Sequence, residues 1–212
     1  MTNGYVGLTF DDGPHPSSTT ALLDALRVGG ARATFFIWGE HAQRHPDLLR
    51  EVRSAGMWIA NHTFTHPHLP ELGEPAVFNE ISWTQQSIQQ ITGLTPRLFR
   101  PPFGETNATV RDTAARLGLS EVLWTVDTLD WAGASTAEIV QSAATVRPGG
   151  IILMHDNGFQ TTVRAVPRIL CGLADRGLRP GKIVFTSDGS AVAVAPDTVL
   201  GGQALSPWSR RR

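Results

Sequence analysis

Short apolar runs alternate with amphipathic stretches along this chain, and this alternation restricts its fold more than any other feature. The apolar runs predict strands over residues 5–10, 33–38, 57–60, 97–99, 121–126, 151–154 and 182–186, with a short extra strand over 191–195. The amphipathic stretches predict helices over residues 17–29, 46–55, 75–92, 108–117, 136–146 and 163–176. About seven such units with short connections are typical of a parallel sheet covered by helices.

We therefore expect an α/β fold of one domain, a closed or partly closed (β/α) barrel, with an open doubly wound sheet as the alternative. The chain has 212 residues, 41% of them hydrophobic and 17% charged, with a net charge of −1. These values permit a full core and exclude an extended disordered chain. Glycine, serine and arginine dominate from Gly201 onwards, so we expect a loose tail there.

Charge, hydropathy and cysteine content exclude several kinds of partner. No apolar run approaches the length of a membrane span, and the near-zero net charge gives no attraction to nucleic acid or to an anionic membrane. Cys171 is the sole cysteine, which rules out an intramolecular disulfide and a four-cysteine zinc site. No signal peptide is visible after Met1.

Polar side chains follow five of the predicted strands directly. They are Asp11-Asp12, residues 62–66, residues 100–104, residues 127–131 and His155-Asp156. The active sites of parallel α/β folds lie at the carboxyl ends of the strands. The sequence therefore predicts that these five clusters meet in one site.

A metal site is the first interpretation of the histidine-rich cluster. His62 and His66 are four residues apart, a spacing that places two imidazoles on one side of a helical turn. With Asp12 as a third ligand they form the open two-histidine, one-carboxylate set that suits catalytic zinc. The alternative for Asp11-Asp12 is a turn, because Asp-Gly-Pro is strong turn chemistry. As no glutamate lies between the two histidines, Asp11 is the nearest candidate base.

Three further histidines are interpreted otherwise. His41 and His45 have the same spacing, but they lie on a polar helical segment that follows no strand, so we expect a solvated face. His68 is expected beside the metal ligands or on the surface.

The remaining clusters each allow a catalytic and a structural interpretation. Arg100 can hold a carboxylate in a bidentate contact, such as one from the cluster at residues 127–131, or can be a surface arginine on a proline-fixed loop. Trp131 can stack on a sugar or lie in the core. His155 can be a general acid or a buried structural histidine.

Together, the clusters resemble the five ordered motifs of the polysaccharide deacetylases, carbohydrate esterase family 4, also called the NodB homology family. The matching stretches are residues 9–13 (TFDDG), 62–66 (HTFTH), 100–104 (RPPFG), 127–131 (DTLDW) and 153–156 (LMHD). Five motifs in order make the match specific, and it extends over about residues 4–197. We place the catalytic domain there and the tail at 198–212.

The resemblance implies a distorted (β/α) barrel and a role for each site residue. Metal binding falls to Asp12, His62 and His66. Asp11 acts as base, Arg100 orients it, Asp130 pairs with Arg100, and His155 protonates the leaving group. Leu153 and Trp131 line the slot for the acetyl methyl, and the backbone N–H of Phe103 helps to hold the oxyanion. Residue 103 is phenylalanine where the family often has tyrosine, which removes a phenol contact to the sugar.

The activity implied is metal-dependent removal of acetyl groups from a polysaccharide or oligosaccharide by a monomeric, secreted enzyme. Zinc is the expected metal, and cobalt can replace it in such enzymes. Acetylxylan and chitin oligomers are the favoured substrates. Peptidoglycan N-acetylglucosamine and a non-catalytic carbohydrate-binding homologue are the alternatives. A serine esterase is disfavoured, since the chain contains no Gly-x-Ser-x-Gly motif.

Overall fold

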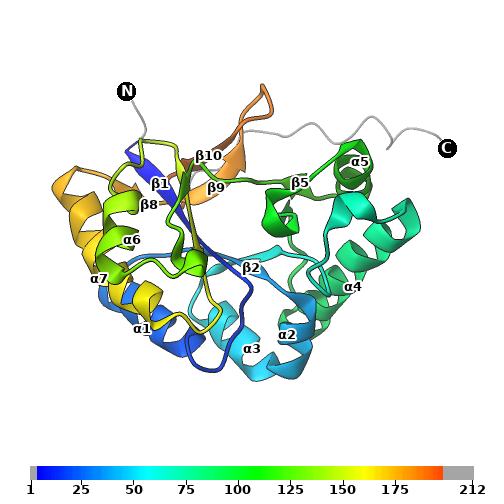
Figure 1. The fold of residues 1–212 in the computed structure, drawn as a ribbon, viewed down its shortest axis with the longest axis horizontal. Coiled ribbons are helices and arrows are strands. Elements are labelled where there is room, and N and C mark those ends of the chain that lie inside the picture. Colours follow the sequence, from blue (N-terminus) through cyan, green and yellow to red (C-terminus); the bar gives the residue numbers. More distant parts are fainter. Residues whose placement is uncertain (1–3, 198–212) are drawn as a thin grey trace.

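The computed structural model describes residues 4–197, which form a curled parallel sheet with helices packed on its outside (Figure 1). Seven strands follow the order β5-β4-β3-β2-β1-β7-β6, and an eighth, β8, also pairs with β1. Their bounds are β1 Tyr5–Asp11, β2 Thr34–Ile37, β3 Trp58–Asn61, β4 Leu98–Phe99, β5 Ser120–Glu121, β6 Val126–Asp127, β7 Ile151–His155 and β8 Arg179–Pro180. The expected α/β class and distorted barrel are confirmed. The predicted tail, residues 198–212, lies outside the described residues.

Seven helices cover the outer face of the sheet (Figure 1). They are α1 Thr19–Val28, α2 Gly39–Arg44, α3 Pro46–Ser54, α4 Glu74–Thr92, α5 Ala108–Arg116, α6 Thr136–Ala143 and α7 Gln160–Asp175, with short 3₁₀ turns η1 Leu69–Glu71, η2 Pro102–Gly104 and η3 Asp130–Ala132. Local chemistry fixes some of their starts: Asn107 caps α5, and Ser135 forms a capping box with Glu138 on α6. No helix within residues 4–197 is long and apolar enough to cross a membrane.

The sheet curls without closing, and the prediction of one strand over 121–126 is wrong. The segment instead contains β5 at one edge of the sheet and β6 at the other, and the residues between them cross the gap. The apolar run gave no sign of this crossing, because Val122, Leu123 and Trp124 have the composition of a strand, although Val122 is buried and Leu123 is exposed. Carbonyls in the gap are satisfied by a side chain: Arg100 donates to Val122 (3.0 Å) and Leu123 (3.3 Å).

The prediction that residues 182–186 form a seventh strand of the parallel sheet is also wrong. β9 Lys182–Phe185 pairs antiparallel with β10 Ala191–Val194 in a separate hairpin. Ile183 is buried and joins the same apolar cluster as Phe36 and Ile151. The hairpin therefore covers apolar surface inside the curl, a role that a local strand pattern does not distinguish from that of a sheet strand.

The alternation of side chains along the strands separates core from site. Leu8 and Phe10 of β1 belong to the large core that includes the inner faces of the helices. The residues between and after them, Thr9 and Asp11, face the inside of the curl. On β7 the same alternation places Leu153 and His155 on the inside, and the register pairs Asp11 with His155. Parallel pairing thus brings two predicted site residues together.

Candidate active site

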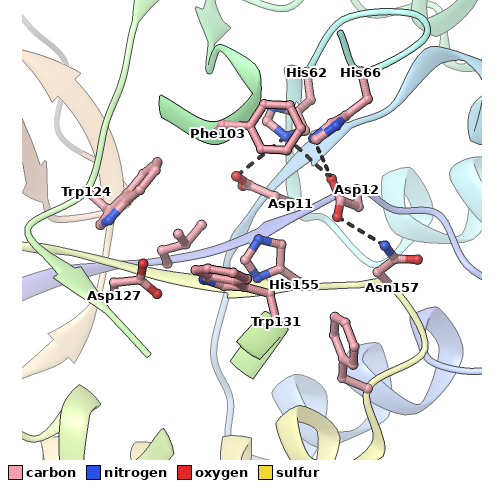
Figure 2. A pocket seen from close by; sticks show the side chains of 12 residues that line it. Asp11, Asp12, His62, His66, Phe103, Trp124, Asp127, Trp131, His155 and Asn157 are labelled. Atoms are coloured by element: carbon pink, nitrogen blue, oxygen red, sulfur yellow. Dashed lines mark hydrogen bonds and ion pairs between the residues drawn. The ribbon is translucent and has the colours of Figure 1, made fainter. Parts of the chain in front are cut away.

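A pocket of about 330 Å³ lies at the carboxyl ends of the strands, where the sequence places its polar clusters (Figure 2). Eight of the ten predicted site residues line it; the other two, Arg100 and Asp130, lie behind the lining. The lining consists of Asp11, Asp12, His62, His66, Phe103, Trp124, Asp127, Trp131, Leu153, His155, Asn157 and Phe159. Residues from five separate strand ends therefore share one cavity.

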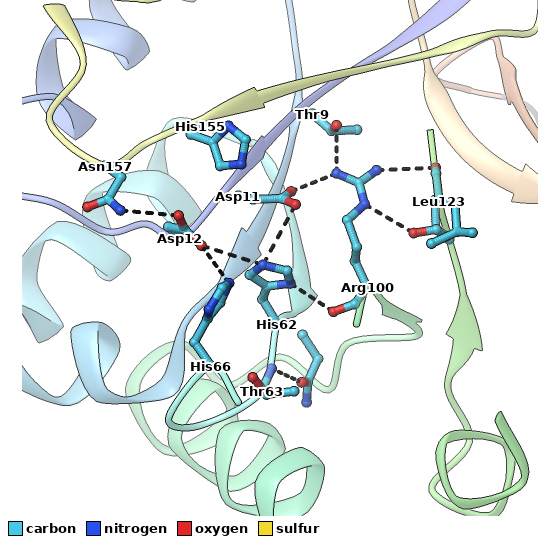
Figure 3. A network of polar contacts seen from close by, with 12 residues as sticks. Thr9, Asp11, Asp12, His62, Thr63, His66, Arg100, Leu123, His155 and Asn157 are labelled. Carbon is cyan, nitrogen blue, oxygen red and sulfur yellow. Dashed lines mark hydrogen bonds and ion pairs between the residues drawn. The ribbon is translucent and has the colours of Figure 1, made fainter. Parts of the chain in front are cut away.

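The three predicted metal ligands converge on one point (Figure 3). Asp12 Oδ1 lies 3.5 Å from His62 Nε2 and 3.3 Å from His66 Nε2, and one ligand atom from each residue lies within 4.8 Å of the others. Asp12 Oδ1 is buried and receives no hydrogen bond. A buried carboxylate oxygen without a donor is costly. A dication bound here would satisfy it, so these residues fit a metal.

The partners of the two histidines support the same conclusion. His62 Nδ1 is 2.8 Å from the Arg100 carbonyl, which accepts the Nδ1 proton, so Nε2 is the ring nitrogen that faces Asp12. Burial and the nearby His62 imidazole lower the pKa of His66 to about 4, so this ring is neutral at pH 7. Burial raises the pKa of Asp12, but the adjacent His62, His155 and His66 outweigh it and lower that pKa well below its ordinary range. A carboxylate and two imidazoles form an N₂O set typical of zinc.

The loop that carries His62 and His66 is held by two residues that sequence reasoning missed. Glu80 of α4 accepts hydrogen bonds from the backbone N–H groups of Phe64 (2.9 Å) and Thr65 (2.8 Å). Asn61 accepts one from the Thr63 N–H (3.0 Å). The sequence contained a signal for Glu80, because it lies three residues after Val77 and beside Ile81, on the buried stripe of its helix.

Arg100 is fully buried and bound to Asp11, as the resemblance implies. Its Nη1 donates to Asp11 Oδ1 (2.6 Å) and to Thr9 Oγ1 (2.9 Å). The guanidinium also lies 4.0 Å from the centroid of the Phe36 ring. Burial lowers the pKa of Arg100, and the adjacent carboxylate opposes this shift. Since one oxygen of Asp11 is bound to the arginine, the other, Oδ2, is left on the side of His62, 3.7 Å from its Nε2.

Asp130 pairs with His155, so the implied pairing of Asp130 with Arg100 is wrong. Asp130 Oδ1 is 2.7 Å from His155 Nδ1, and Oδ2 accepts from the backbone N–H of His155 (2.8 Å) and from Thr162 Oγ1 (2.7 Å). The alternative partner for Arg100, Asp127, accepts from the Leu129 N–H. The arginine's donors go to Asp11, Thr9 and gap carbonyls, which leaves Asp130 for the histidine.

The Asp130 contact determines the charge of His155. Burial would lower the pKa of His155, but the hydrogen bond to Asp130 and the charges of Asp130, Asp11 and Asp12 raise it to about 9. His155 therefore carries a proton on both ring nitrogens at neutral pH. Nδ1 is bound to Asp130, so Nε2 is the proton-bearing atom available to the pocket.

Aromatic side chains form the rim of the pocket. Phe103 and Trp131 are each 54% exposed, whereas Leu153 is buried. Phe103 stacks on the exposed His68, with ring centroids 4.2 Å apart, which places His68 on the surface beside the rim. Trp124 and Phe159 complete the aromatic lining and were not predicted. Figure 2 shows Trp124 and Trp131 on the side of the pocket away from His62 and His66.

The expectation of a solvated face at His41 and His45 is wrong for His41. His41 is half-buried and its Nδ1 lies 2.8 Å from the backbone carbonyl of Asp12. Its ring stacks on Trp38 (centroids 4.3 Å apart), which in turn stacks on the predicted ligand His66 (4.8 Å). His41 therefore supports the site from outside the pocket, although the polar residues around it in the sequence suggested solvent.

Comparisons with known proteins agree with this geometry. The family model described as polysaccharide deacetylase matches residues 1–122. A bifunctional xylanase/xylan deacetylase of Cellvibrio japonicus is 40% identical over 92% of this chain, which spans 29% of that protein. A chitooligosaccharide deacetylase of Bradyrhizobium is 36% identical, with 81% of this chain and 85% of that protein covered. The structure of a family 4 carbohydrate esterase from Streptomyces lividans in complex with acetate is 51% identical, with a TM-score of 0.86 over 93% of this chain and all of that one.

Proposed function

Because this chain belongs to the polysaccharide deacetylase family, we propose that it hydrolyses acetyl groups on xylan or on chitin oligosaccharides with one bound divalent metal, zinc in the first place and cobalt as a substitute. The observation that supports a metal most strongly is the buried Asp12 Oδ1, which receives no hydrogen bond and faces two histidine Nε2 atoms. We also propose that the enzyme is a monomer. We propose that it works outside the cell, because polymeric substrates do not enter cells.

Asp12, His62 and His66 would hold the metal. When bound, a divalent metal polarises the acetyl carbonyl and makes a water molecule more acidic. Asp11 accepts the proton of the attacking water at Oδ2, since Arg100 holds Oδ1. A fixed base of this kind contributes about 10²–10⁴ in rate. Arg100 prevents the carboxylate from rotating away.

His155 donates the proton that the leaving group needs. Asp130 keeps the ring oriented and charged. A sugar amine leaves poorly without this proton, so a histidine charged at neutral pH supports amide as well as ester hydrolysis. The backbone N–H of Phe103 is assigned to the developing oxyanion. Leu153 and Trp131 are assigned to the acetyl methyl, because both line the pocket.

The test is acetate release from acetylated xylan, N-acetyl chitooligosaccharides and peptidoglycan, measured side by side with and without a chelator. We expect release from at least one of the first two substrates, loss of release with chelator, and recovery when zinc is added back. Release from peptidoglycan alone would replace the substrate in this proposal. Oligosaccharide binding without acetate release would support a carbohydrate-binding protein and reject the proposed activity.

A further inference from the structure

Three consecutive polar residues, at the last position of β7 and just after it, lie beside Asp11 and Asp12. The first of them, His155, is the proposed acid. The next two, Asp156 and Asn157, have no part in the chemistry proposed above. Asp156 is buried, and Asn157 is half-buried and lines the pocket.

Asn157 binds the metal ligand Asp12 directly (Figure 3). Its Nδ2–H donates to Asp12 Oδ2 over 3.2 Å. The other oxygen, Oδ1, is the one that receives no hydrogen bond and faces His62 and His66. The amide therefore engages one oxygen of the carboxylate and leaves the other for a metal. Without this hydrogen bond, the carboxylate would be free to turn about its last torsion.

Asp156 contacts the backbone on both sides of Asp12, at Asp11 and at Gly13. Its carboxyl group accepts hydrogen bonds from Ser18 Oγ and Thr19 Oγ1, each 2.6 Å long, and its N–H donates to the Asp11 carbonyl (2.8 Å). A Cβ on Gly13 would lie 2.4 Å from Asp156 Oδ2, so the chain after Asp12 packs directly on this carboxyl group. Asp156 thus links β7, the Asp11–Gly13 segment and the start of α1.

The conformation of Asp12 explains why this support is needed. Asp12 has a φ of 73°, in the left-handed region that non-glycine residues rarely adopt. Such a conformation is strained and persists only where the surroundings enforce it. Here three residues restrain Asp12 and its neighbour. Asn157 binds the Asp12 carboxylate, His41 contacts the Asp12 carbonyl, and Asp156 binds the adjoining backbone at Asp11.

We propose that Asn157 is a positioning residue for the metal, which presents Asp12 Oδ1 to the ion, and that Asp156 supports the backbone beneath it. The inference rests on the proposed function only in taking Asp12, His62 and His66 as the ligands. Outer residues that orient a metal ligand change metal affinity or activity by about 10–100-fold when they are removed. We expect a change of that size in zinc affinity for Asn157→Ala.

The experiment measures zinc affinity at pH 7 by competition with a chromophoric chelator, for the wild type, Asn157→Ala and Asn157→Leu. The matched control is Gln160→Ala, because the Gln160 amide also joins the two loops but donates to the Ser17 carbonyl (2.7 Å), away from Asp12. Both Asn157 variants should bind zinc about 10–100-fold more weakly, and Gln160→Ala should bind it like the wild type. Urea unfolding of the metal-free proteins checks that each variant is folded. At saturating zinc, acetate release by Asn157→Ala should recover most of its wild-type value.

Wild-type zinc affinity in both Asn157 variants would overturn the inference, as would an equal loss in Gln160→Ala. Absence of zinc binding by the wild type would overturn both the inference and the proposed metal site. If the wild type binds zinc and the Asn157 variants bind it weakly, but no glycan yields acetate, the positioning role stands and the proposed activity fails.

Discussion

Positive φ angles occur at both ends of the sheet, but within residues 4–197 the residues other than glycine that adopt them all lie at the carboxyl end. At the amino end, where a helix returns to the next strand, positive φ angles fall on glycines such as Gly56 (76°) and Gly93 (73°). At the carboxyl end, five residues that are not glycine have φ between 56° and 73°, and each follows a strand: Asp12, Thr63, His66, Phe103 and Leu129. They are the whole non-glycine set with positive φ within residues 4–197.

This difference shows which end of the sheet contains the strained backbone that lowers the stability of the folded protein. Glycine adopts a positive φ without steric cost, so the amino-end turns are unstrained. A proposed metal ligand or a pocket wall needs a side chain, so Asp12, His66 and Phe103 adopt a strained backbone instead. The carboxyl end also buries charges such as Arg100, and its polar networks hold both kinds of unfavourable residue in place. Substitutions at the two ends should therefore affect different properties.

Asp11→Asn should give the largest effect on the rate. The amide keeps an acceptor for Arg100 but cannot take a proton from water, so kcat should fall by about 10²–10⁴-fold. Zinc content should stay close to that of the wild type, whereas the unfolding midpoint should fall, because the buried Arg100 charge loses its partner. The comparison variant is Asp24→Asn, on the exposed face of α1, which should retain full kcat. Near-normal turnover in Asp11→Asn would show that another group is the base.

Arg100→Met should give the largest loss of stability. It leaves the Asp11 carboxylate buried without its partner, which costs about 3–5 kcal/mol of unfolding free energy. Arg27→Met breaks the exposed pair with Asp24 and should cost less than about 1 kcal/mol. Urea unfolding measures both. The double variant Asp11→Asn/Arg100→Met should recover part of the loss, since no charge is then left unpaired. No recovery would mean that the arginine acts only through packing and its carbonyl contacts.

Asp156→Asn should change how stability depends on pH. Burial raises the pKa of Asp156 from 3.8 to about 7, although its bonds to Ser18 and Thr19 oppose this shift. The folded state then holds this proton more tightly than the unfolded state. The unfolding free energy should therefore fall as pH rises from about 4 to 7, by up to about 4 kcal/mol from this group. Asparagine has no proton to lose, so urea unfolding of the metal-free variant should show a flatter profile. An unchanged slope would refute the assignment.

Gly93→Ala, at the amino end of the sheet, should have the smallest effect. An added Cβ would meet no atom within 4 Å, so the cost comes only from the φ of 73°, which is unfavourable for alanine. We expect about 1–2 kcal/mol of lost stability, measured by urea unfolding, with kcat unchanged. Gly172→Ala, in the regular part of α7 with equally open space, should stabilise the protein by about 0.5–1 kcal/mol. A loss at both glycines would show that backbone strain is not the cause at Gly93.

Much of the fold and the site was predictable because strand ends and motifs are local signals. Apolar runs located β1, β2, β3 and β7, and the polar residues after them predicted most of the side chains that line the pocket. Contacts between distant segments were not predictable. Residues 121–126 look like one strand because a short apolar segment that crosses a gap has the same composition as one that pairs in a ladder. Residues 182–186 look like a sheet strand because a hairpin has the same composition.

The supporting residues of the site were the hardest to predict. Asp130 was assigned to Arg100, but the fold brings His155 to it instead. Asn157 has no partner nearby in sequence, and its contact with Asp12 joins residues 145 positions apart. His41 had a misleading neighbourhood of polar residues. Only Glu80 carried a local sign, a carboxylate on an apolar helix face.

The central claim is that the carboxyl end of the sheet holds one catalytic metal on Asp12, His62 and His66. The most direct test is to strip the protein with a chelator, remove the chelator, and follow acetate release as zinc is added in steps. The account predicts no activity without metal, a linear rise, and saturation at one zinc per chain, with no rise for His62→Ala at the same additions. Full activity in the stripped protein, or an equal rise in His62→Ala, would contradict it.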